Sequence, residues 1–207
     1  MNVQYDIIII GSGPAGLMAA ASASRLGVNV LVVEKMAQVA RKLRITGKGR
    51  CNITNTVPLA DFIKCIHPDG RKLRPAFSKF FSMHLIAFLS ELKVKTKEER
   101  GSRIFPVSDN ANEVADALYS YCKSQKVDFL LNSEIQNISV SKENANKLSV
   151  IIKNSKQSFS THSVIVATGG LSYPATGCTG DGYRFAKNTG HNLIPTRPAL
   201  VPLCVDH

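Results

Sequence analysis

The 207-residue sequence lacks the features that mark secreted, membrane and metal-binding proteins. Its five cysteines are scattered, with no C-x-x-C pair and no metal-ligand spacing, which predicts neither a redox disulfide nor a zinc site. No apolar run approaches the roughly 20 residues of a membrane-spanning helix, and the N-terminus has no basic signal-peptide segment. No Ser/His/Asp set or pair of acid–base carboxylates stands out. We therefore expect a cytoplasmic protein without a membrane or metal partner.

The segment from Tyr5 to Glu34 is the most informative part of the chain. Residues 6–10 form a short apolar run, which is typical of a parallel strand buried on both faces. Gly11, Gly13 and Gly16 follow with the spacing G-x-G-x-x-G. This spacing predicts a tight turn at the first glycine, a close approach of a pyrophosphate at the second, and close packing of the next helix at the third.

A helix over about residues 14–26 and a strand over residues 30–33 complete this unit, and Glu34 ends the strand. The N-terminus of the helix favours a diphosphate, because its N–H groups are free and its dipole is positive there. A carboxylate 23 residues after Gly11 suits both hydroxyls of an adenosine ribose, whereas a 2′-phosphate would favour arginine. The pattern predicts an adenine dinucleotide, either FAD or NAD; the alternative is a glycine turn with no ligand.

The rest of the chain interrupts this βαβ pattern. We expect an irregular loop over residues 36–58, helices over 76–92, 113–124 and 183–189, and a short strand at 93–97. A β-meander follows at about 127–162, with strands at 127–131, 134–141, 147–153 and 157–161 and a hairpin turn at 144–146. Residues 163–167 then predict another buried parallel strand, which leads into Thr168-Gly169-Gly170.

Acidic residues are few, with 15 against 26 basic residues and a net charge of +11. Nucleic acid is the obvious partner for such a chain. However, a basic cluster at residues 41–50 directly follows the predicted ribose-binding strand, which favours a bound diphosphate. No aromatic interleaving or known nucleic-acid motif is visible. We therefore predict no nucleic-acid partner, with a basic RNA-associated protein as an alternative.

The inserted meander and the later strand distinguish between FAD and NAD as the predicted cofactor. An NAD domain usually continues with further βα units, whereas here a meander intervenes before a strand that ends in A-T-G-G. The pairing resembles flavoproteins with a glutathione-reductase-like fold. The segment Gly177–Gly182 with its following helix resembles the fumarate-reductase branch of that fold.

Further motifs narrow the resemblance. T-G-K-G-R-C-N-I-T-N at 46–55, S-R-I-F-P at 102–106, A-T-G-G-L-S-Y-P at 167–174, T-G-D-G-Y at 179–183 and P-A-L-V-P-L at 198–203 follow one another in the chain. Together they resemble the bacterial flavoprotein family called aminoacetone-oxidase-like or BaiN-type, named after a 3-dehydro-bile-acid Δ4,6-reductase. The resemblance covers essentially the whole chain.

The resemblance also sets expectations for domains. It implies an α/β, glutathione-reductase-like FAD-binding Rossmann domain over residues 1–192, with a helical and loop region inserted at about 56–126 and the β-meander at about 127–162. Residues 193–207 would begin a substrate domain that is truncated here, because members of the family look like chains of about 400 residues. A complementing C-terminal half is therefore a possible partner.

Several site residues follow from the resemblance. It places Thr46–Asn52 over the flavin, with Arg50 and Asn52 as ring contacts, and brings the backbone of Ile135 or Gln136 to the adenine. Cys51 is either redox-active or, as we favour, a packing residue. Asp181 is either a flavin-proximal carboxylate or, as the local sequence favours, a helix N-cap.

The basic residues after Glu34 have two interpretations, since they either neutralise the diphosphate or belong to a solvated surface. No catalytic residue is assigned, because the flavin itself performs the redox chemistry. The candidate cofactor-binding residues are Gly11, Ser12, Gly13, Pro14, Ala15, Gly16, Glu34, Lys35, Arg41, Lys42, Thr46, Gly49, Arg50, Cys51, Asn52, Ile135, Gln136, Ala167, Thr168, Gly169, Gly170 and Asp181.

The predicted function is an FAD-dependent oxidoreductase, or its cofactor half, that transfers a hydride between flavin and a small organic substrate. Oxygen or NAD(P)H would complete the cycle, and a second G-x-G-x-x-G for a dedicated NAD(P) domain is absent from the sequence. The alternatives are a non-catalytic dinucleotide-binding module or inactive fragment, and an NAD-dependent dehydrogenase.

Overall fold

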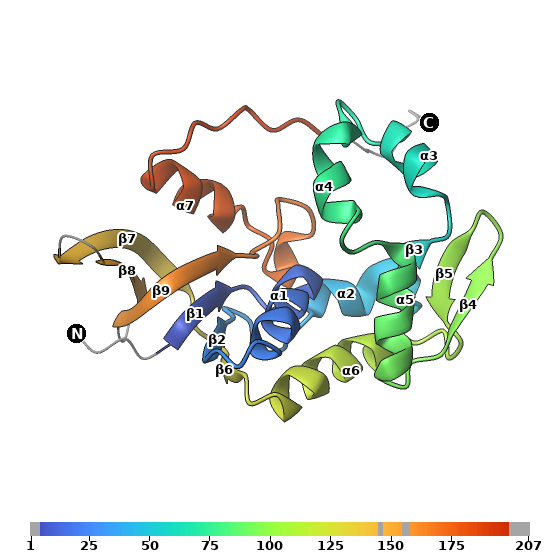
Figure 1. Ribbon diagram of the computed structural model, residues 1–207, viewed down its shortest axis with the longest axis horizontal. Helices are drawn as coiled ribbons and strands as arrows, with labels where there is room; N and C mark the ends of the chain where they lie inside the picture. Colours follow the sequence, from blue (N-terminus) through green and yellow to red (C-terminus); the bar gives the residue numbers. More distant parts are fainter. Residues whose placement is uncertain (1–4, 145–146, 155–157, 199–207) are drawn as a thin grey trace, which may run out of the picture.

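A mixed six-stranded sheet lies in the left half of the molecule in Figure 1, a computed structural model that describes residues 5–144, 147–154 and 158–198. Its strand order is β6-β2-β1-β9-β8-β7. The first four strands in this order are parallel, and the last two add antiparallel pairs. The strands are β1 (Tyr5–Ile10), β2 (Val30–Val33), β6 (Asp128–Leu130), β7 (Ile135–Asn144), β8 (Lys147–Asn154) and β9 (Ser158–Val166).

The N-terminal β1–α1–β2 unit forms as predicted. Helix α1 (Pro14–Ser24) begins with a proline whose missing N–H costs nothing at that position. It ends two residues before the predicted end, and Gly27 then takes a φ of 75° in the turn into β2. The connection carries the chain from β1 to β2 on one side, while β9 pairs with β1 on the other. The order of the strands therefore reverses at β1.

Strand β9 replaces two predicted strands, at 157–161 and 163–167, with one. Its first half pairs antiparallel with β8 and its second half pairs parallel with β1. No break forms between them, because the fully buried Thr161 hydroxyl donates to the carbonyl of Asp6 at 3.0 Å and joins the strand to β1. The end of the strand is less buried than predicted, since Ile165 and Val166 are 36% and 44% exposed.

The predicted meander is also smaller than expected. Strand β6 pairs parallel with β2, so it belongs to the parallel part of the sheet, and the meander consists of β7, β8 and β9. The predicted hairpin turn at 144–146 falls largely outside the described residues. The fold class is nevertheless confirmed: an α/β Rossmann fold with a parallel sheet and an inserted meander.

Each face of the parallel strands has its own core. On one face, Ile9 and Val32 pack with Leu17 of α1 and with Val114 and Leu118 of α6 (Ala111–Ser124). The other face packs apolar side chains of the sheet against α7 (Asp181–Asn188), and its members are Ile8, Ile10, Leu31, Val33, Ile135, Ile138, Phe159 and Phe185. The alternation of Ile8, Ile9 and Ile10 between the two cores is that of a strand buried on both faces.

The region between β2 and β6 is more ordered than predicted. The loop expected at 36–58 contains α2 (Arg41–Ile45), the 3-10 turn η1 (Thr46–Gly49) and β3 (Thr54–Asn55). Next come α3 (Leu59–Lys64), η2 (Gly70–Leu73), α4 (Arg74–Phe77), α5 (Ser82–Glu91), β4 (Thr96–Glu99), β5 (Arg103–Pro106) and α6 (Ala111–Ser124). Strands β3, β5 and β4 form a separate three-stranded sheet.

The prediction of a single helix over residues 76–92 was wrong. It is split into α4 and α5 because Phe81 is extended, with φ −136° and ψ −171°, and caps α5. Its N–H donates to Nδ1 of His84 at 3.1 Å. The rings of Phe62, Phe77 and Phe81 pack together with centroids 5.2–5.6 Å apart, so these half-buried aromatic residues form a cluster separate from the two cores of the sheet.

Within the described part of the chain, no helix has the length and apolar character needed to cross a membrane. The same residues contain no group of three or more His, Cys, Asp or Glu side chains that could hold a metal ion. Residues 193–198 have no regular secondary structure, and the rest of the region predicted to begin a substrate domain lies outside the described residues.

Candidate functional site

A cavity of about 510 Å³ lies at the carboxyl ends of β1, β2 and β9, where the strand order reverses. Open α/β sheets bind their ligands at this type of position. Fourteen of the predicted site residues line it: Gly11, Gly13, Pro14, Ala15, Glu34, Lys35, Arg41, Lys42, Thr46, Ile135, Ala167, Thr168, Gly169 and Asp181.

The three glycines of the first turn have different surroundings. Gly11 has a φ of 104°, and a Cβ there would lie 2.5 Å from the carbonyl oxygen of Ala167. A Cβ on Gly16 would lie 1.9 Å from the carbonyl oxygen of Gly11. Gly13 differs, because a Cβ there would meet nothing within 4 Å and the residue lines the cavity. Gly11 and Gly16 therefore allow close packing of the backbone, and Gly13 leaves space open in the cavity.

The N-terminus of α1 faces this open space. The N–H groups of Ala15 and Gly16 precede the first helical hydrogen bond, which Leu17 donates to Gly13 at 2.9 Å, and neither finds an acceptor among the described residues. The first turn of the helix carries no acidic side chain. Free donors and a positive helix dipole make this an anion-binding position.

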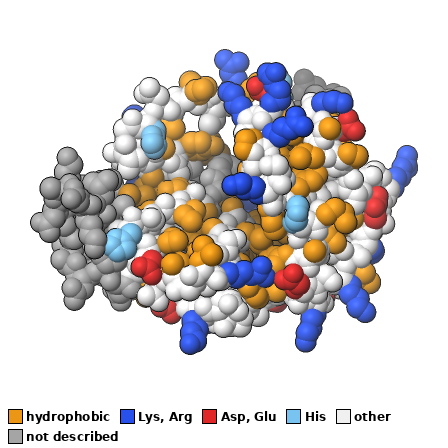
Figure 2. Space-filling view, viewed as in Figure 1, with side chains coloured by type: hydrophobic (Ala, Val, Ile, Leu, Met, Phe, Trp, Pro, Cys, Tyr) orange, Lys and Arg blue, Asp and Glu red, His pale blue; other side chains and the backbone are white. Residues whose placement is uncertain are grey.

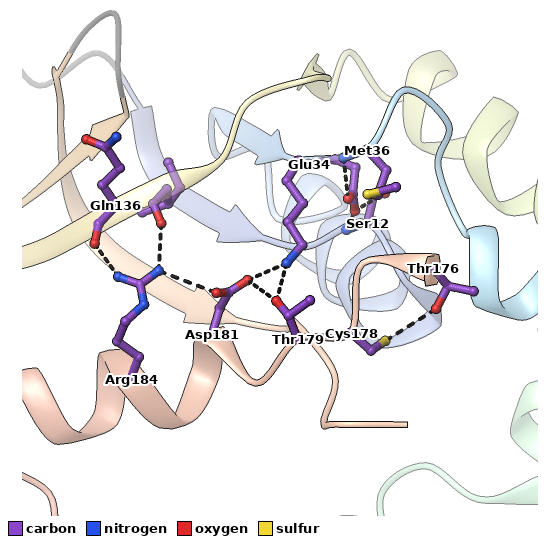
Figure 3. A network of polar contacts seen from close by, with 11 residues as sticks. Ser12, Glu34, Met36, Gln136, Thr176, Cys178, Thr179, Asp181 and Arg184 are labelled. Carbon is purple, nitrogen blue, oxygen red and sulfur yellow. Dashed lines mark hydrogen bonds and ion pairs between the residues drawn. The ribbon is translucent and has the colours of Figure 1, made fainter. Parts of the chain in front are cut away.

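Ser12 and Glu34 tie the glycine turn to the end of β2 (Figure 3). One Glu34 carboxylate oxygen accepts hydrogen bonds from the main-chain N–H (2.8 Å) and the hydroxyl (2.7 Å) of Ser12. The other accepts from the N–H of Met36 at 2.9 Å. Ser12 is fully buried and does not line the cavity, so its part is to hold the carboxylate. A carboxylate has about four acceptor positions, and one is left for a ligand.

A second polar network crosses from β2 to α7 (Figure 3). The Lys35 ammonium donates to the Asp181 carboxylate at 2.7 Å and to the Thr179 hydroxyl at 2.5 Å. Arg184 donates to the carbonyl oxygen of Ile135 at 3.1 Å and to that of Gln136. The backbone of Ile135 or Gln136 was predicted to reach an adenine. Both carbonyl oxygens accept from Arg184, and Ile135 lines the cavity whereas Gln136 does not.

The N-cap interpretation of Asp181 was wrong. Gly180, with a φ of 83°, occupies the N-cap position of α7, and Asp181 is the first helical residue. Burial opposes ionisation of Asp181, but the hydrogen bond and charge of Lys35, together with Arg184, outweigh it and hold the pKa of this carboxyl below its usual value. Asp181 therefore remains an ionised carboxylate in the cavity wall.

The segment Thr46–Asn52 contributes only Thr46 to the cavity wall. Arg50 turns to the second sheet, where its guanidinium pairs with Glu99 and, at 2.7 Å, with Asp109, and lies 4.4 Å from the centre of the Phe105 ring. Gly49 and Asn52 do not line the cavity either. The predicted flavin contacts of this segment therefore stay predictions.

Cys51 is fully buried among apolar residues of the α1 core. Burial raises the pKa of its thiol, which outweighs the hydrogen bond from Thr46. A thiol that resists ionisation is a poor nucleophile, so the geometry agrees with the packing role that the sequence favoured. Gly170 also lies outside the cavity wall, where a Cβ would come within 3.6 Å of the Tyr183 hydroxyl.

Sequence reasoning missed part of the wall. The missed residues are Ile10, Val33, Gln38, Ala40, Leu43, Ser133, Glu134, Val166, Thr176, Gly177, Cys178 and Phe185. Several carry a local signal that could have been used: Ser133 and Glu134 directly precede the meander strand, and Gly177 and Cys178 belong to the G-C-T-G-D-G segment. Ala40 had none, because only the structure shows its φ of 58° and its N–H bonded to the Ser12 carbonyl at 3.1 Å.

Comparison with known families agrees with this geometry. The model of the HI0933-like protein Rossmann domain matches residues 5–197. The chain belongs to this family. The family resemblance inferred from the motifs is thereby confirmed, and so is a Rossmann fold of the type that binds dinucleotides.

Curated relatives match over nearly the whole chain. The ribosomal RNA dihydrouridine synthase of Escherichia coli is 31% identical over 199 residues, which cover 96% of this chain and 48% of the relative. The 3-dehydro-bile acid delta(4,6)-reductase of Clostridium scindens is 33% identical over 200 residues, covering 95% and 47%. The chain thus spans about half the length of these relatives.

Solved structures share the fold. The 3-ketosteroid-delta4-(5alpha)-dehydrogenase of Rhodococcus jostii aligns with a TM-score of 0.61 and 15% identity, covering 84% of this chain and 48% of that one. A flavocytochrome c3 fumarate reductase aligns with a TM-score of 0.60 and 19% identity, covering 90% and 40%. At these identities the likeness concerns the fold alone.

Two glycine substitutions distinguish packing from ligand space. Gly16→Ala places a methyl group against the Gly11 carbonyl, and we expect the free energy of unfolding to fall by about 3 kcal/mol or more. Gly13→Ala meets open space, and we expect a change within about 1 kcal/mol. Urea unfolding followed by circular dichroism measures both, and equal losses in the two variants would contradict the assigned roles.

The Lys35–Asp181 pair predicts a pH-dependent contribution to stability. The lowered pKa of Asp181 stabilises the fold above the unfolded-state value of about 3.9, and the contribution is lost as the pH falls through the folded-state value. We expect Asp181→Asn to lower the free energy of unfolding by about 1–2 kcal/mol at pH 7 and by progressively less below about pH 4.

The control is Asp61→Asn, which removes an exposed pair with Lys64 and should have little effect at any pH. A difference between wild type and Asp181→Asn that stays constant from pH 7 to pH 3 would show that the ion pair does not contribute as described.

Proposed function

We propose that this chain is the cofactor-binding part of an FAD-dependent oxidoreductase, which transfers a hydride between the flavin and a carbon–carbon double bond conjugated to a carbonyl. The observation that carries the proposal is the cavity at the strand-order reversal, with the free N–H groups of α1 on one side and the Glu34 carboxylate on another.

The residues present fit a dinucleotide. Gly13 leaves room for a diphosphate to approach the main chain, and Ala15 and Gly16 offer unpaired N–H donors. Glu34, held by Ser12, retains an acceptor position for a ribose hydroxyl. Lys42, whose ammonium bonds the Ser172 hydroxyl at 2.5 Å, and Arg41 line the same cavity and would offset the diphosphate charge.

FAD is favoured over NAD by the inserted β7–β8 hairpin, which stands where an NAD domain usually continues with βα units. When bound, the flavin supplies the hydride chemistry. The chain's own residues would bind and orient it, and the cavity wall includes the apolar side chains of Val33, Val166 and Phe185.

The substrate bond is suggested by the relatives' names. Formation of dihydrouridine adds two hydrogens to the C5–C6 double bond of uracil, which is conjugated to the C4 carbonyl. A 3-oxo bile acid with 4,6 unsaturation presents the same group. In each substrate a hydride can add to an electron-poor carbon of the conjugated system, and a proton then completes the reduction of the enolate, so one kind of flavin site would serve either substrate.

A uracil base in RNA is the second candidate substrate, beside the small organic molecule that the sequence favours. It is supported by two relatives, the ribosomal RNA dihydrouridine synthases of Escherichia coli and Haemophilus influenzae, each 31% identical over nearly the whole chain. NAD(P)H is proposed as the external electron donor. A C-terminal part like that of the relatives is proposed to complete the substrate site.

The visible spectrum of the purified chain mixed with FAD tests this proposal. We expect the chain to bind FAD with the resolved absorbance bands of a protein-bound flavin. Gly13→Val fills the space at the α1 N-terminus, and we expect the dissociation constant to rise by about 100-fold, since hydrogen bonds to charged groups contribute about 1.5–3 kcal/mol each.

Ala60→Val is the control, because Ala60 is exposed on α3, lies outside the cavity wall and is not at a positive φ, so the valine adds bulk away from the site without backbone strain. Uptake of NAD but not FAD would favour the dehydrogenase alternative. Bound FAD that neither NADPH nor dithionite reduces would favour a non-catalytic module. Equal FAD affinity in wild type and Gly13→Val would contradict the proposal that the cavity binds the FAD diphosphate.

A further inference from the structure

A group of exposed cations lies outside the wall of the proposed dinucleotide site. Helices α3, α4 and α5 and the turn η2 form a helical arm, residues 59–91, with five basic residues and three acidic ones. All three carboxylates are paired: Asp61 with Lys64, Asp69 with Arg71, and Glu91 with Arg25 of α1. Three exposed cations, Lys72, Arg74 and Lys79, make no ion pair with any described residue.

The cofactor does not account for these charges. In the basic cluster at 41–50, Arg41 and Lys42 line the cavity, while Arg44 pairs with Asp116 at 2.6 Å and Arg50 pairs with the second sheet. None of the arm's cations lines the cavity. Figure 2 shows Lys and Arg side chains gathered over the part of the molecule where Figure 1 places α3 and α4.

Packing and hydrogen bonds within the helical arm fix the backbone that carries these three cations. The rings of Phe62, Phe77 and Phe81 pack in a cluster that joins α3 to α4 and α5. The Asp69 carboxylate caps η2 by accepting from the N–H of Arg71 at 3.1 Å. The backbone that carries Lys72, Arg74 and Lys79 is therefore positioned before any ligand binds, which lowers the entropy lost on binding.

An exposed aromatic surface adjoins these cations. Main-chain bonds from Ser78 to Arg74 and from Phe80 to Ala76 continue α4, so Arg74, Lys79 and Phe80 belong to one helical stretch. Phe80 is 43% exposed and stacks on His84 with ring centroids 5.9 Å apart and planes at 28°. The two rings also line a hollow of about 300 Å³.

Unpaired positive charges beside exposed aromatic rings are typical of surfaces that bind single-stranded nucleic acid. Unpaired cations neutralise phosphates, and exposed rings stack on unpaired bases, a combination by which proteins hold single-stranded nucleic acid. We propose that the helical arm is the docking surface for a single-stranded RNA segment, with Lys72, Arg74 and Lys79 on phosphates and Phe80 and His84 against bases. This inference rests on the proposed function, in its form with a uracil base of RNA as substrate.

Fluorescence anisotropy of a labelled single-stranded U12 RNA, titrated with the purified chain between 50 and 200 mM salt, tests the proposal. We expect the triple variant Lys72→Glu, Arg74→Glu, Lys79→Glu to weaken binding by at least tenfold. The slope of log affinity against log salt should decrease by about 2, since each contact with a single strand contributes about 0.7. Phe80→Ala should weaken binding on the order of tenfold with the slope unchanged.

The control is Lys95→Glu, Lys123→Glu, Lys187→Glu, which changes the net charge equally at three exposed lysines outside the arm and should retain most of the affinity. Should the arm variant fail to keep its circular dichroism spectrum, the same three positions changed to glutamine replace it. FAD uptake, measured on the same samples, reports the proposed function separately, because loss of RNA binding alone leaves the flavin spectrum intact.

Three results would overturn the proposal. The wild-type chain does not bind U12; the arm variant and the control lose affinity equally; or the arm variant abolishes binding to vesicles of phosphatidylserine and phosphatidylcholine while U12 binding is unchanged. Binding of a 12-base-pair RNA duplex as tight as that of U12, with no effect of Phe80→Ala, would equally contradict the stacking contribution.

Discussion

The close approach of α1 to the end of β1 is the constraint on which the rest of the site depends. The position of a Cβ on Gly16 lies 1.9 Å from the Gly11 carbonyl oxygen, so the helix starts against the strand with no side chain between them. This contact aims the free N–H groups of α1 at the cavity. It also brings Ser12 within hydrogen-bond distance of Glu34, which fixes the carboxylate at the end of β2.

Strand β9 positions the wall of the cavity that lies opposite α1. Because it pairs with β1 in its second half and with β8 in its first, one strand joins the parallel sheet to the meander. Its end leads directly into Ala167, whose carbonyl lies 2.5 Å from the position of a Gly11 Cβ. The Lys35–Asp181 pair then links β2 to α7 across the same cavity. The cavity is therefore shaped by contacts between segments more than 100 residues apart in the chain.

Sequence alone predicted the features that depend on local patterns. The β1–α1–β2 unit follows from an apolar run, three glycines and a carboxylate within 30 residues, and the structure reproduces it. The sequence did not predict the ion pairs of Arg50 with Glu99 and Asp109 or that of Asp181 with Lys35, because these partners lie 49 to 146 residues away. The division of the predicted helix at Phe81 was missed for a similar reason, since it depends on packing against Phe62 of α3.

The central claim is that the cavity at the strand-order reversal holds a dinucleotide with its diphosphate on the N-terminus of α1. A crystal structure of the chain grown with FAD tests it most directly. The account predicts diphosphate oxygens about 2.7–3.2 Å from the main-chain nitrogens of Ala15 or Gly16 and a ribose hydroxyl beside Glu34. FAD bound elsewhere, or a diphosphate distant from α1 with the cavity empty, would contradict it.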